Sequence, residues 1–288
     1  MPALYPDVDI FYGSFERRTK IQPLDDIDLV IGMMGLGGTY EASGAEVRVT
    51  APTGTVLSTL CHDGTALLNS RKVINAFVRG LAEIPQYERA TVHRNGSAAV
   101  LNLKSYPWSF DIVPAFFTTP ETDGVTYYII PNQDGHWMKT DPRIDRDRIR
   151  TINQTHGGHV LNALRVMKYW NRRPTMPTMP SYALECLVVR HYEVSALYGS
   201  TATPYVDVEI RRLLRALISD VHQPVSDPKG IQGDLNTMSW PSRVAVAGRA
   251  STDLLRAEQA QAAELRGDHR EALNHWRAVL GPELPAFS

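Results

Sequence analysis

Cysteine is scarce in this chain of 288 residues, which contains only Cys61 and Cys186. Two cysteines cannot build a disulfide framework, and they are too few for a zinc site of the Cys-x-x-Cys type. An excess of charge of one sign is also missing, because 30 basic residues face 31 acidic ones and the formal net charge is -1. Such a chain has no overall field that attracts long nucleic acids or anionic membranes, so any site for a polyanion must be local.

Long hydrophobic runs are absent as well. No window approaches 18 uninterrupted apolar residues, and the stretch MPALYPDVDIFYG has no basic patch followed by an apolar core. The sequence therefore predicts neither a membrane span nor a secretory signal. With 43% hydrophobic residues and few cysteines, it is typical of a globular cytoplasmic protein with a sizeable core.

Two hydrophobic periods divide the chain. Residues 8–120 hold short β-branched or aromatic runs separated by Gly, Pro and Ser, which predict strands, with one helix over 69–84. From about residue 145 onward, apolar residues recur at the helical period. We expect a mixed α+β protein: an α/β lobe with a central mixed sheet over 1–145, a helical lobe over 146–288, and an active-site cleft between them. Residues 222–250, rich in Pro, Gly, Ser and Asp, predict a long loop.

A pair of acids opens one of the predicted strands. In the stretch DDIDLVIGM, Asp26 and Asp28 flank Ile27, so their side chains share one face of the strand, with Cα atoms roughly 6 to 7 Å apart. Carboxylates this close repel each other unless a cation lies between them. Two Mg²⁺ ions would remove the repulsion, and in-line nucleotidyl transfer uses such a pair. A solvated strand edge is the alternative interpretation.

Two further features add to the acid pair. Asp111 is a lone acid in the apolar run WSFDIVPAF, where burial is costly unless the carboxylate meets a metal or another cation, so we predict a third ligand there. Its alternative role is to cap a turn before Pro114. Upstream, Gly13 and Ser14 predict a turn whose backbone N–H groups and hydroxyl can contact phosphate oxygens.

The order of these motifs resembles a known superfamily. Gly-Ser, a spacer, Asp-x-Asp and a distant Asp are similar to the DNA polymerase β-type nucleotidyltransferases. The segments GSFERRTKIQPLDDIDLVI, FDIVPAF, HWMKTDPR, VMKYWN and SYALECLV resemble the bacterial cyclic-oligonucleotide synthases, the CD-NTases with a SMODS domain, which are relatives of cyclic GMP-AMP synthase. The resemblance covers nearly the whole chain. Family members usually carry a long helix before the Gly-Ser turn, whereas 12 residues precede Gly13 here.

The resemblance implies roles for individual residues. It implies that Asp26, Asp28 and Asp111 are catalytic and bind two Mg²⁺ ions, with Mn²⁺ as the alternative, and that Asp111 helps to position or deprotonate the attacking ribose hydroxyl. The implied nucleotide contacts are Gly13 and Ser14 on the triphosphate, Lys168 on the β- and γ-phosphates, Ser181 on phosphate, and Tyr182 stacked on the base. Solvation of a helix end by Lys168 and core packing of Tyr182 are the alternatives.

The resemblance also implies an activity, the Mg²⁺-dependent synthesis of a cyclic di- or trinucleotide messenger from NTPs with release of pyrophosphate. The expected substrates are ATP or GTP, with UTP and CTP as further candidates, and the expected setting is bacterial anti-phage (CBASS) signalling with a HORMA-type regulatory protein as a candidate partner. Transfer to an RNA end, a protein or a small molecule is the alternative. A catalytically silent nucleotide-binding module is the third hypothesis.

Other motifs carry weaker signals. The stretch GLGG lacks the third glycine of a dinucleotide-binding motif, which would fall at Tyr40, so we expect a mobile loop. His156 and His159 have a helical metal spacing without further ligands, which favours structural roles. Trp137 and Arg143 resemble family residues near the nucleotide, although packing explains Trp137 equally well.

Overall fold

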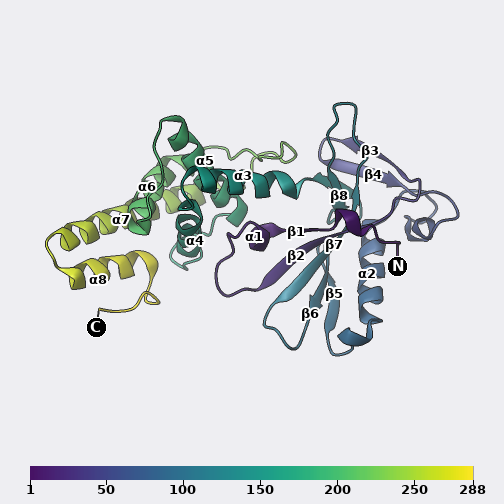
Figure 1. Ribbon diagram of the computed structural model, residues 1–288, viewed down its shortest axis with the longest axis horizontal. Helices are drawn as coiled ribbons and strands as arrows, with labels where there is room; N and C mark the ends of the chain where they lie inside the picture. Colours follow the sequence, from purple (N-terminus) through teal and green to yellow (C-terminus); the bar gives the residue numbers. More distant parts are fainter. Residues whose placement is uncertain (288) are drawn as a thin grey trace. The chain divides into compact units, whose positions relative to one another are not determined.

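The computed structural model describes residues 1–287, and the chain divides into two compact units, Met1–Arg146 and Asp147–Ser288 (Figure 1). The first unit combines a sheet with short helices and the second is helical, which confirms the predicted α+β class. None of the helices in residues 1–287 has the length and apolar character needed to cross a membrane. The strands of the first unit are β1 (Ile10–Tyr12), β2 (Asp26–Gly32), β3 (Thr39–Ser43), β4 (Glu46–Thr50), β5 (Thr91–Asn95), β6 (Ala98–Asn102), β7 (Ser109–Phe117), β8 (Tyr128–Pro131) and β9 (Trp137–Thr140).

The sheet is organised around β7. Seven of its nine strands run in the order β1-β2-β7-β8-β9-β4-β3; the other two branch from β7, with β6 paired to β7 and β5 paired to β6. The pairing of β2 with β7 is parallel, and the other pairings are antiparallel. Strand β7 is long enough to pair with β6 near its start and with β8 near its end. The N-terminal ends of β2 and β7 therefore lie side by side.

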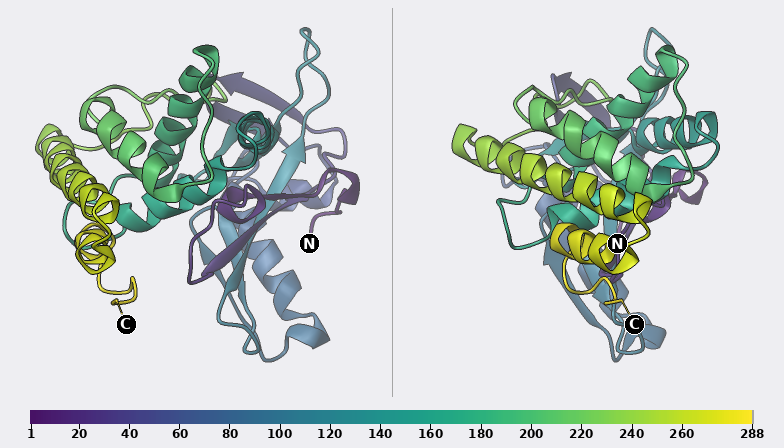
Figure 2. Two further views of the ribbon diagram at one scale, coloured as in Figure 1. Left: turned by 60° about the vertical axis from the view of Figure 1, so that its left-hand side comes forward. Right: turned by 90° about the vertical axis from the view of Figure 1, so that its left-hand side faces the viewer.

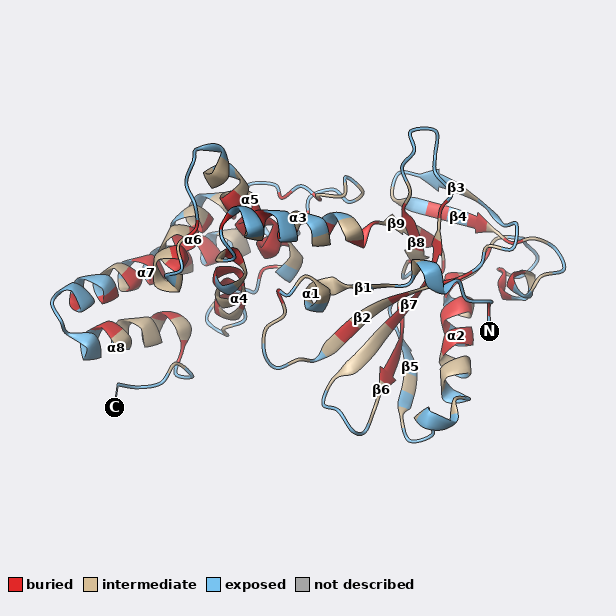
Figure 3. Ribbon diagram, in the orientation of Figure 1, coloured by how far each residue is buried: buried red, intermediate tan, exposed pale blue. Residues whose placement is uncertain are grey.

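One face of this sheet is covered by α2 (Ser70–Ala82), the helix predicted over 69–84. The side chain of Asn69 caps the helix by accepting hydrogen bonds from two backbone N–H groups of its first turn. Several residues of α2 are buried (Figure 3), and Val73 and Phe77 share a cluster with Ile112 of β7. Leu29 and Ile31 pack against the same cluster, so the residues that alternate with the acids of β2 face the helix, as the alternation predicts.

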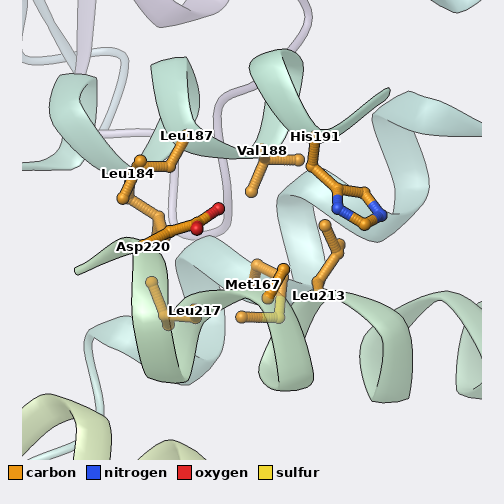
Figure 4. Close-up of a pocket in the computed structure, with 9 residues that line it drawn as sticks. Met167, Leu184, Leu187, Val188, His191, Leu213, Leu217 and Asp220 are labelled. Atoms are coloured by element: carbon orange, nitrogen blue, oxygen red, sulfur yellow. The ribbon is translucent and has the colours of Figure 1, made fainter. Parts of the chain in front are cut away.

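The second unit buries its core between helices. They are α4 (Val160–Asn171), α5 (Ser181–Leu197), α6 (Val206–Asp220), α7 (Trp240–Leu265) and α8 (His269–Leu280), while α3 (Pro142–Thr155) runs across the boundary between the units. Figure 2 shows α7 and α8 packed side by side. Met167, Leu184 and Leu213 bring α4, α5 and α6 together, and with His191 they border a cavity of about 10 Å³ (Figure 4).

The prediction of a loop over 222–250 is wrong from residue 240 onward, because α7 begins there. The side chain of Ser239 accepts a hydrogen bond from the backbone N–H of Ser242, and Pro241 occupies the first helical turn. Serine before a helix and proline in its first turn are signals for a helix start. Their position inside a polar, Pro-rich stretch made the segment resemble a loop.

Candidate active site

The three predicted carboxylates lie on one face of the first unit's sheet. Asp28 of β2 is paired directly with Asp111 of β7, and Asp26 is paired with Ser109. Paired residues on neighbouring strands point to the same face, with strands about 4.8 Å apart. All three acids are half-buried and lie on the face opposite α2. The structure therefore brings Asp26, Asp28 and Asp111 together, as the sequence predicts.

Burial and the close packing of acids on this face raise the pKa values of Asp28 and Asp111. Burial raises the pKa of Asp28 to about 6, and the negative charges of Asp26 and Asp111 add to the effect. The pKa of Asp111 is also raised, by burial first and by Asp26 second, against the hydrogen bond that Ser109 donates to it. The charged forms of Asp28 and Asp111 are thus destabilised by burial and by neighbouring acids, which is the condition that a divalent cation relieves.

The same face includes an aromatic residue that sequence reasoning missed. Tyr12 of β1 is paired with Asp28 and packs against the small apolar cluster of Val30, Ala115 and Tyr128. Burial raises the pKa of the Tyr12 hydroxyl, with further contributions from the carboxylates, Asp28 foremost. The phenol stays neutral and closes one side of the acidic face.

The Gly-Ser turn packs directly against this acidic face. Gly13 opens the short helix α1 (Gly13–Glu16) with a φ of 71°, which other residues rarely adopt. A Cβ atom at this position would lie 1.8 Å from Oδ2 of Asp28. Only glycine allows the turn to approach the carboxylate this closely, so Gly13 and Ser14 lie next to the carboxylates.

The chain after α1 folds back onto the turn. The backbone N–H groups of Thr19 and Lys20 donate hydrogen bonds of 2.9 and 3.0 Å to the carbonyl oxygen of Ser14. The Lys20 ammonium then lies 2.6 Å from Oδ1 of Asp26 and forms a second ion pair with Asp25. A lysine thus connects the Gly-Ser turn to the acidic face.

In the second unit, Lys168 is a core residue. Its side chain is 6% exposed, and its ammonium lies 2.6 Å from Oε2 of Glu185, which is 2% exposed. The two residues come from α4 and α5, so the ion pair joins these helices at the level of the core. Lys168 is therefore buried, which contradicts the alternative that it solvates a helix end.

Ser181 and Tyr182 open α5, with Ser181 exposed and Tyr182 half-buried. The Tyr182 hydroxyl lies 2.5 Å from the ammonium of Lys229 and 3.3 Å from Oδ1 of Asp227. The same ammonium lies 4.4 Å from the centroid of the Tyr182 ring, a cation–π contact. The loop between α6 and α7 therefore fixes the position of the ring.

Comparison with known proteins places the chain in a family. No family model matches the sequence. A curated protein of Bacillus cereus strain VD146, named "Probable cyclic nucleotide synthase", is 38% identical over 288 residues, which cover 99% of this chain and 85% of that protein. The chain belongs to the bacterial cyclic nucleotide synthases, the CD-NTases.

Solved CD-NTase structures share the fold. Escherichia coli MS115-1 CdnC with ATP superposes with a TM-score of 0.67 at 15% identity, over 96% of this chain and 84% of that one. Vibrio cholerae DncV, a cyclic AMP-GMP synthase, gives 0.64 at 16% identity, over 96% and 69%. This CD-NTase is therefore a nucleotidyltransferase enzyme with the polymerase β-like fold.

The donor set of this CD-NTase suits a hard divalent cation, because carboxylate oxygens are the protein ligands that Mg²⁺ and Mn²⁺ prefer. As they stand, however, no three His, Cys, Asp or Glu side chains within residues 1–287 are arranged to hold an ion. Lys20 takes one oxygen of Asp26. The chemistry of the residues fits the metal, and closing them around it requires side-chain movement.

Several weaker motifs of this CD-NTase have structural roles. Trp137 is fully buried, and its indole N–H donates a hydrogen bond of 2.9 Å to the carbonyl oxygen of Leu68, which favours the packing interpretation. Arg143 donates hydrogen bonds to Asp141 and to the carbonyl oxygen of Thr126. His156 is buried with both ring nitrogens hydrogen-bonded, as expected for a structural role.

Sequence reasoning missed the partners of the predicted residues. Glu185 had a visible signal, because a lone acid in the run ALECLVV is as costly to bury as the one in β7. Lys20, Asp227 and Lys229 had none, since charged residues in polar loops are typical of solvated surface. Their contacts depend on tertiary structure.

Proposed function

We propose that this CD-NTase joins NTPs into a cyclic di- or trinucleotide and releases pyrophosphate, with Mg²⁺, or Mn²⁺ in its place, as the cofactor. The observation that carries the proposal is the direct pairing of Asp28 with Asp111 on one sheet face, with Asp26 beside them and the Gly-Ser turn packed against Asp28. Three acids crowded in this way are stable together when cations neutralise them.

Asp26, Asp28 and Asp111 would hold the metal. When bound, the two ions would supply stabilisation of the charge that develops on the attacking and leaving oxygens. A ribose hydroxyl of one nucleotide forms a bond to the α-phosphorus of the next, and the bond to pyrophosphate breaks. Asp111 orients that hydroxyl and accepts its proton, and a second reaction of the same kind closes the ring.

Nucleotide binding is assigned to the residues that resemble the family's contacts. Gly13 and Ser14 hold the triphosphate, because the turn offers backbone N–H groups and a hydroxyl. The resemblance assigns Lys168 to the β- and γ-phosphates, a role for which its ammonium must leave the buried ion pair with Glu185. It assigns Ser181 to a phosphate and Tyr182 to stacking on a base, an interaction worth about 1 to 3 kcal/mol that tolerates several bases. Lys229 holds the ring of Tyr182 in place through a hydrogen bond and a cation–π contact.

The bound states of the structural neighbours suggest substrates and a partner. They include CdnC with ATP, DncV with GTP, and CdnC in complex with a HORMA protein, at 15, 14 and 15% identity. We propose ATP or GTP as substrates, a HORMA-type regulator as a candidate partner, and CBASS signalling in the cytoplasm as the setting. The two free, buried cysteines are typical of a reducing compartment.

The test is incubation of the protein with each labelled NTP, and with all pairs, in the presence of Mg²⁺. The expected result is a product that resists phosphatase, that mass spectrometry identifies as a cyclic oligonucleotide, and that Asp28→Asn abolishes. Transfer of label to added RNA or protein instead would support the alternative acceptor and contradict the proposal. Absence of any product with an equimolar HORMA protein present would contradict it as well.

A further inference from the structure

Lys20 forms an ion pair with Asp26, one of the three acids of the proposed metal site. Its ammonium hydrogen-bonds to Oδ1 of Asp26 at 2.6 Å and also pairs with Asp25. The Lys20 side chain is 18% exposed and the Asp26 side chain 35%, so water screens the pair only in part. A divalent cation that binds both carboxylate oxygens of Asp26 must first displace this ammonium.

The position of Lys20 is fixed from the other side by the Gly-Ser turn. Its backbone N–H and that of Thr19 both donate to the carbonyl oxygen of Ser14, and Thr19 is fully buried. The lysine stem therefore starts at the turn proposed to hold the triphosphate and ends at the first metal-binding acid. A triphosphate on the turn would offer the ammonium new oxygen acceptors within reach of the same stem.

We propose that Lys20 makes metal binding depend on nucleotide, an inference that rests on the proposed function. Without nucleotide, the ammonium neutralises Asp26 and competes with the metal for its oxygen. With nucleotide, the ammonium moves to the triphosphate and Asp26 becomes a metal ligand. Lys20 is thus a positioning residue that orders the assembly of the site, and it prevents the acidic face from holding metal when no substrate is present.

The arrangement of the acids supports this order. Of the three acids, Asp26 is the one whose carboxylate is held by the Lys20 ammonium, at 2.6 Å. Asp28 and Asp111 are already paired across the two strands. The acid that the lysine engages is therefore the one whose release completes the set.

The test is to measure Mn²⁺ binding with and without α,β-methylene ATP. The electron spin resonance signal of free Mn²⁺ reports how much of the ion stays unbound. The variants are Lys20→Met, which keeps the stem and removes the charge, and Lys20→Arg, which keeps the charge. Lys72→Met is the matched control, because Lys72 forms an ion pair of the same length, 2.6 Å, with Asp63 elsewhere in the first unit. Melting temperatures verify that every variant is folded.

Without nucleotide, Lys20→Met should bind Mn²⁺ about fivefold more tightly than the wild type, the upper range for loss of one competing ion pair. The analogue should then strengthen Mn²⁺ binding less in Lys20→Met than in the wild type, while Lys20→Arg and Lys72→Met behave like the wild type. Unchanged or weaker Mn²⁺ binding by folded Lys20→Met would overturn the inference and leave the proposed function intact. Asp28→Asn tests the metal site itself. If this substitution left Mn²⁺ binding unchanged both with and without the analogue, the proposed metal site would be contradicted.

Discussion

The buried acids of the second unit and the crowded acids of the first are treated differently by their surroundings. Asp253 of α7 has a fully buried side chain, and three donors satisfy it: Trp170 at 2.8 Å, Arg249 at 2.6 Å and Arg256 at 3.0 Å. Asp28 is half-buried, and the two charges that affect its pKa most are those of the carboxylates of Asp26 and Asp111. The charge of Asp253 is balanced by its own donors, whereas burial and neighbouring acids raise the pKa of Asp28 to about 6.

This difference separates stability from function. Buried carboxylates with their own cations, such as Glu185 with Lys168, hold helices together and would be costly to leave unpaired. The face that carries Asp28 and Asp111 reduces the stability of the protein without metal, because like charges are held together there. Strain of this kind is typical of sites whose ligand supplies the missing charge.

The largest expected effect is on activity. Asp28→Asn removes a proposed metal ligand, so nucleotidyl transfer should fall by about a thousandfold or more, measured as pyrophosphate release. Without divalent metal, the same substitution should raise the free energy of unfolding by roughly 1 to 3 kcal/mol, because it removes repulsion. Denaturant titration in EDTA measures this second effect. A loss of stability in EDTA would show that Asp28 belongs to the structural class of acids.

Asp253→Asn should have the opposite signature. The substitution leaves Arg249 and Arg256 without their carboxylate in a buried setting, so we expect a loss of about 3 kcal/mol in the free energy of unfolding. Glu258→Gln is the matched control, since the ion pair of Glu258 with Arg215 is exposed and should contribute less than about 1 kcal/mol. Equal losses in the two variants would remove the distinction between buried and exposed pairs.

Gly13→Ala tests how closely the Gly-Ser turn and Asp28 are packed. The added methyl group would meet the Asp28 carboxylate and force a strained φ, so we expect a loss of about 1 to 2 kcal/mol in stability and about tenfold or more in activity. Gly44→Ala provides the comparison, because Gly44 has a similar φ of 61° and no atom within 4 Å of an added Cβ. Equal activity in both variants would mean that the contact with Asp28 is unimportant.

The smallest effect concerns His191, which borders the core cavity of the second unit. Burial lowers the pKa of His191 and the charge of Asp220 opposes this, so the unfolded chain takes up the proton at a higher pH than the folded protein does. Stability is therefore full above about pH 6.5 and falls as the pH drops below it, by less than about 1 kcal/mol. Between pH 7 and 5, the free energy of unfolding should fall less in His191→Gln than in the wild type. An equal fall in the two proteins would contradict this.

The sequence predicted those parts of the molecule that depend on local pattern. The alternation around Ile27 predicted the strand and the shared face of its acids, and a lone acid in an apolar run predicted that Asp111 would join them. Helix α2 followed from its apolar spacing. The partners of these residues could not be predicted, because Lys20 and Lys229 make contacts that depend on how loops fold back onto strands and helices.

The start of α7 shows a second limit. Ser239 and Pro241 are helix signals only when a helix follows, and in a polar stretch they indicate a loop equally well. Strands β8 and β9 lie beyond the region of predicted strands, since their short sequences gain their stability from neighbouring strands. In these segments, tertiary contacts decide the structure.

The most direct measurement is a crystal structure with Mn²⁺ and α,β-methylene ATP, with the metal located by its anomalous signal. We expect Mn²⁺ ligated by Asp26, Asp28 and Asp111, the triphosphate on the turn of Gly13 and Ser14, and Lys20 released from Asp26. Manganese located away from these three carboxylates, with the nucleotide bound, would contradict it.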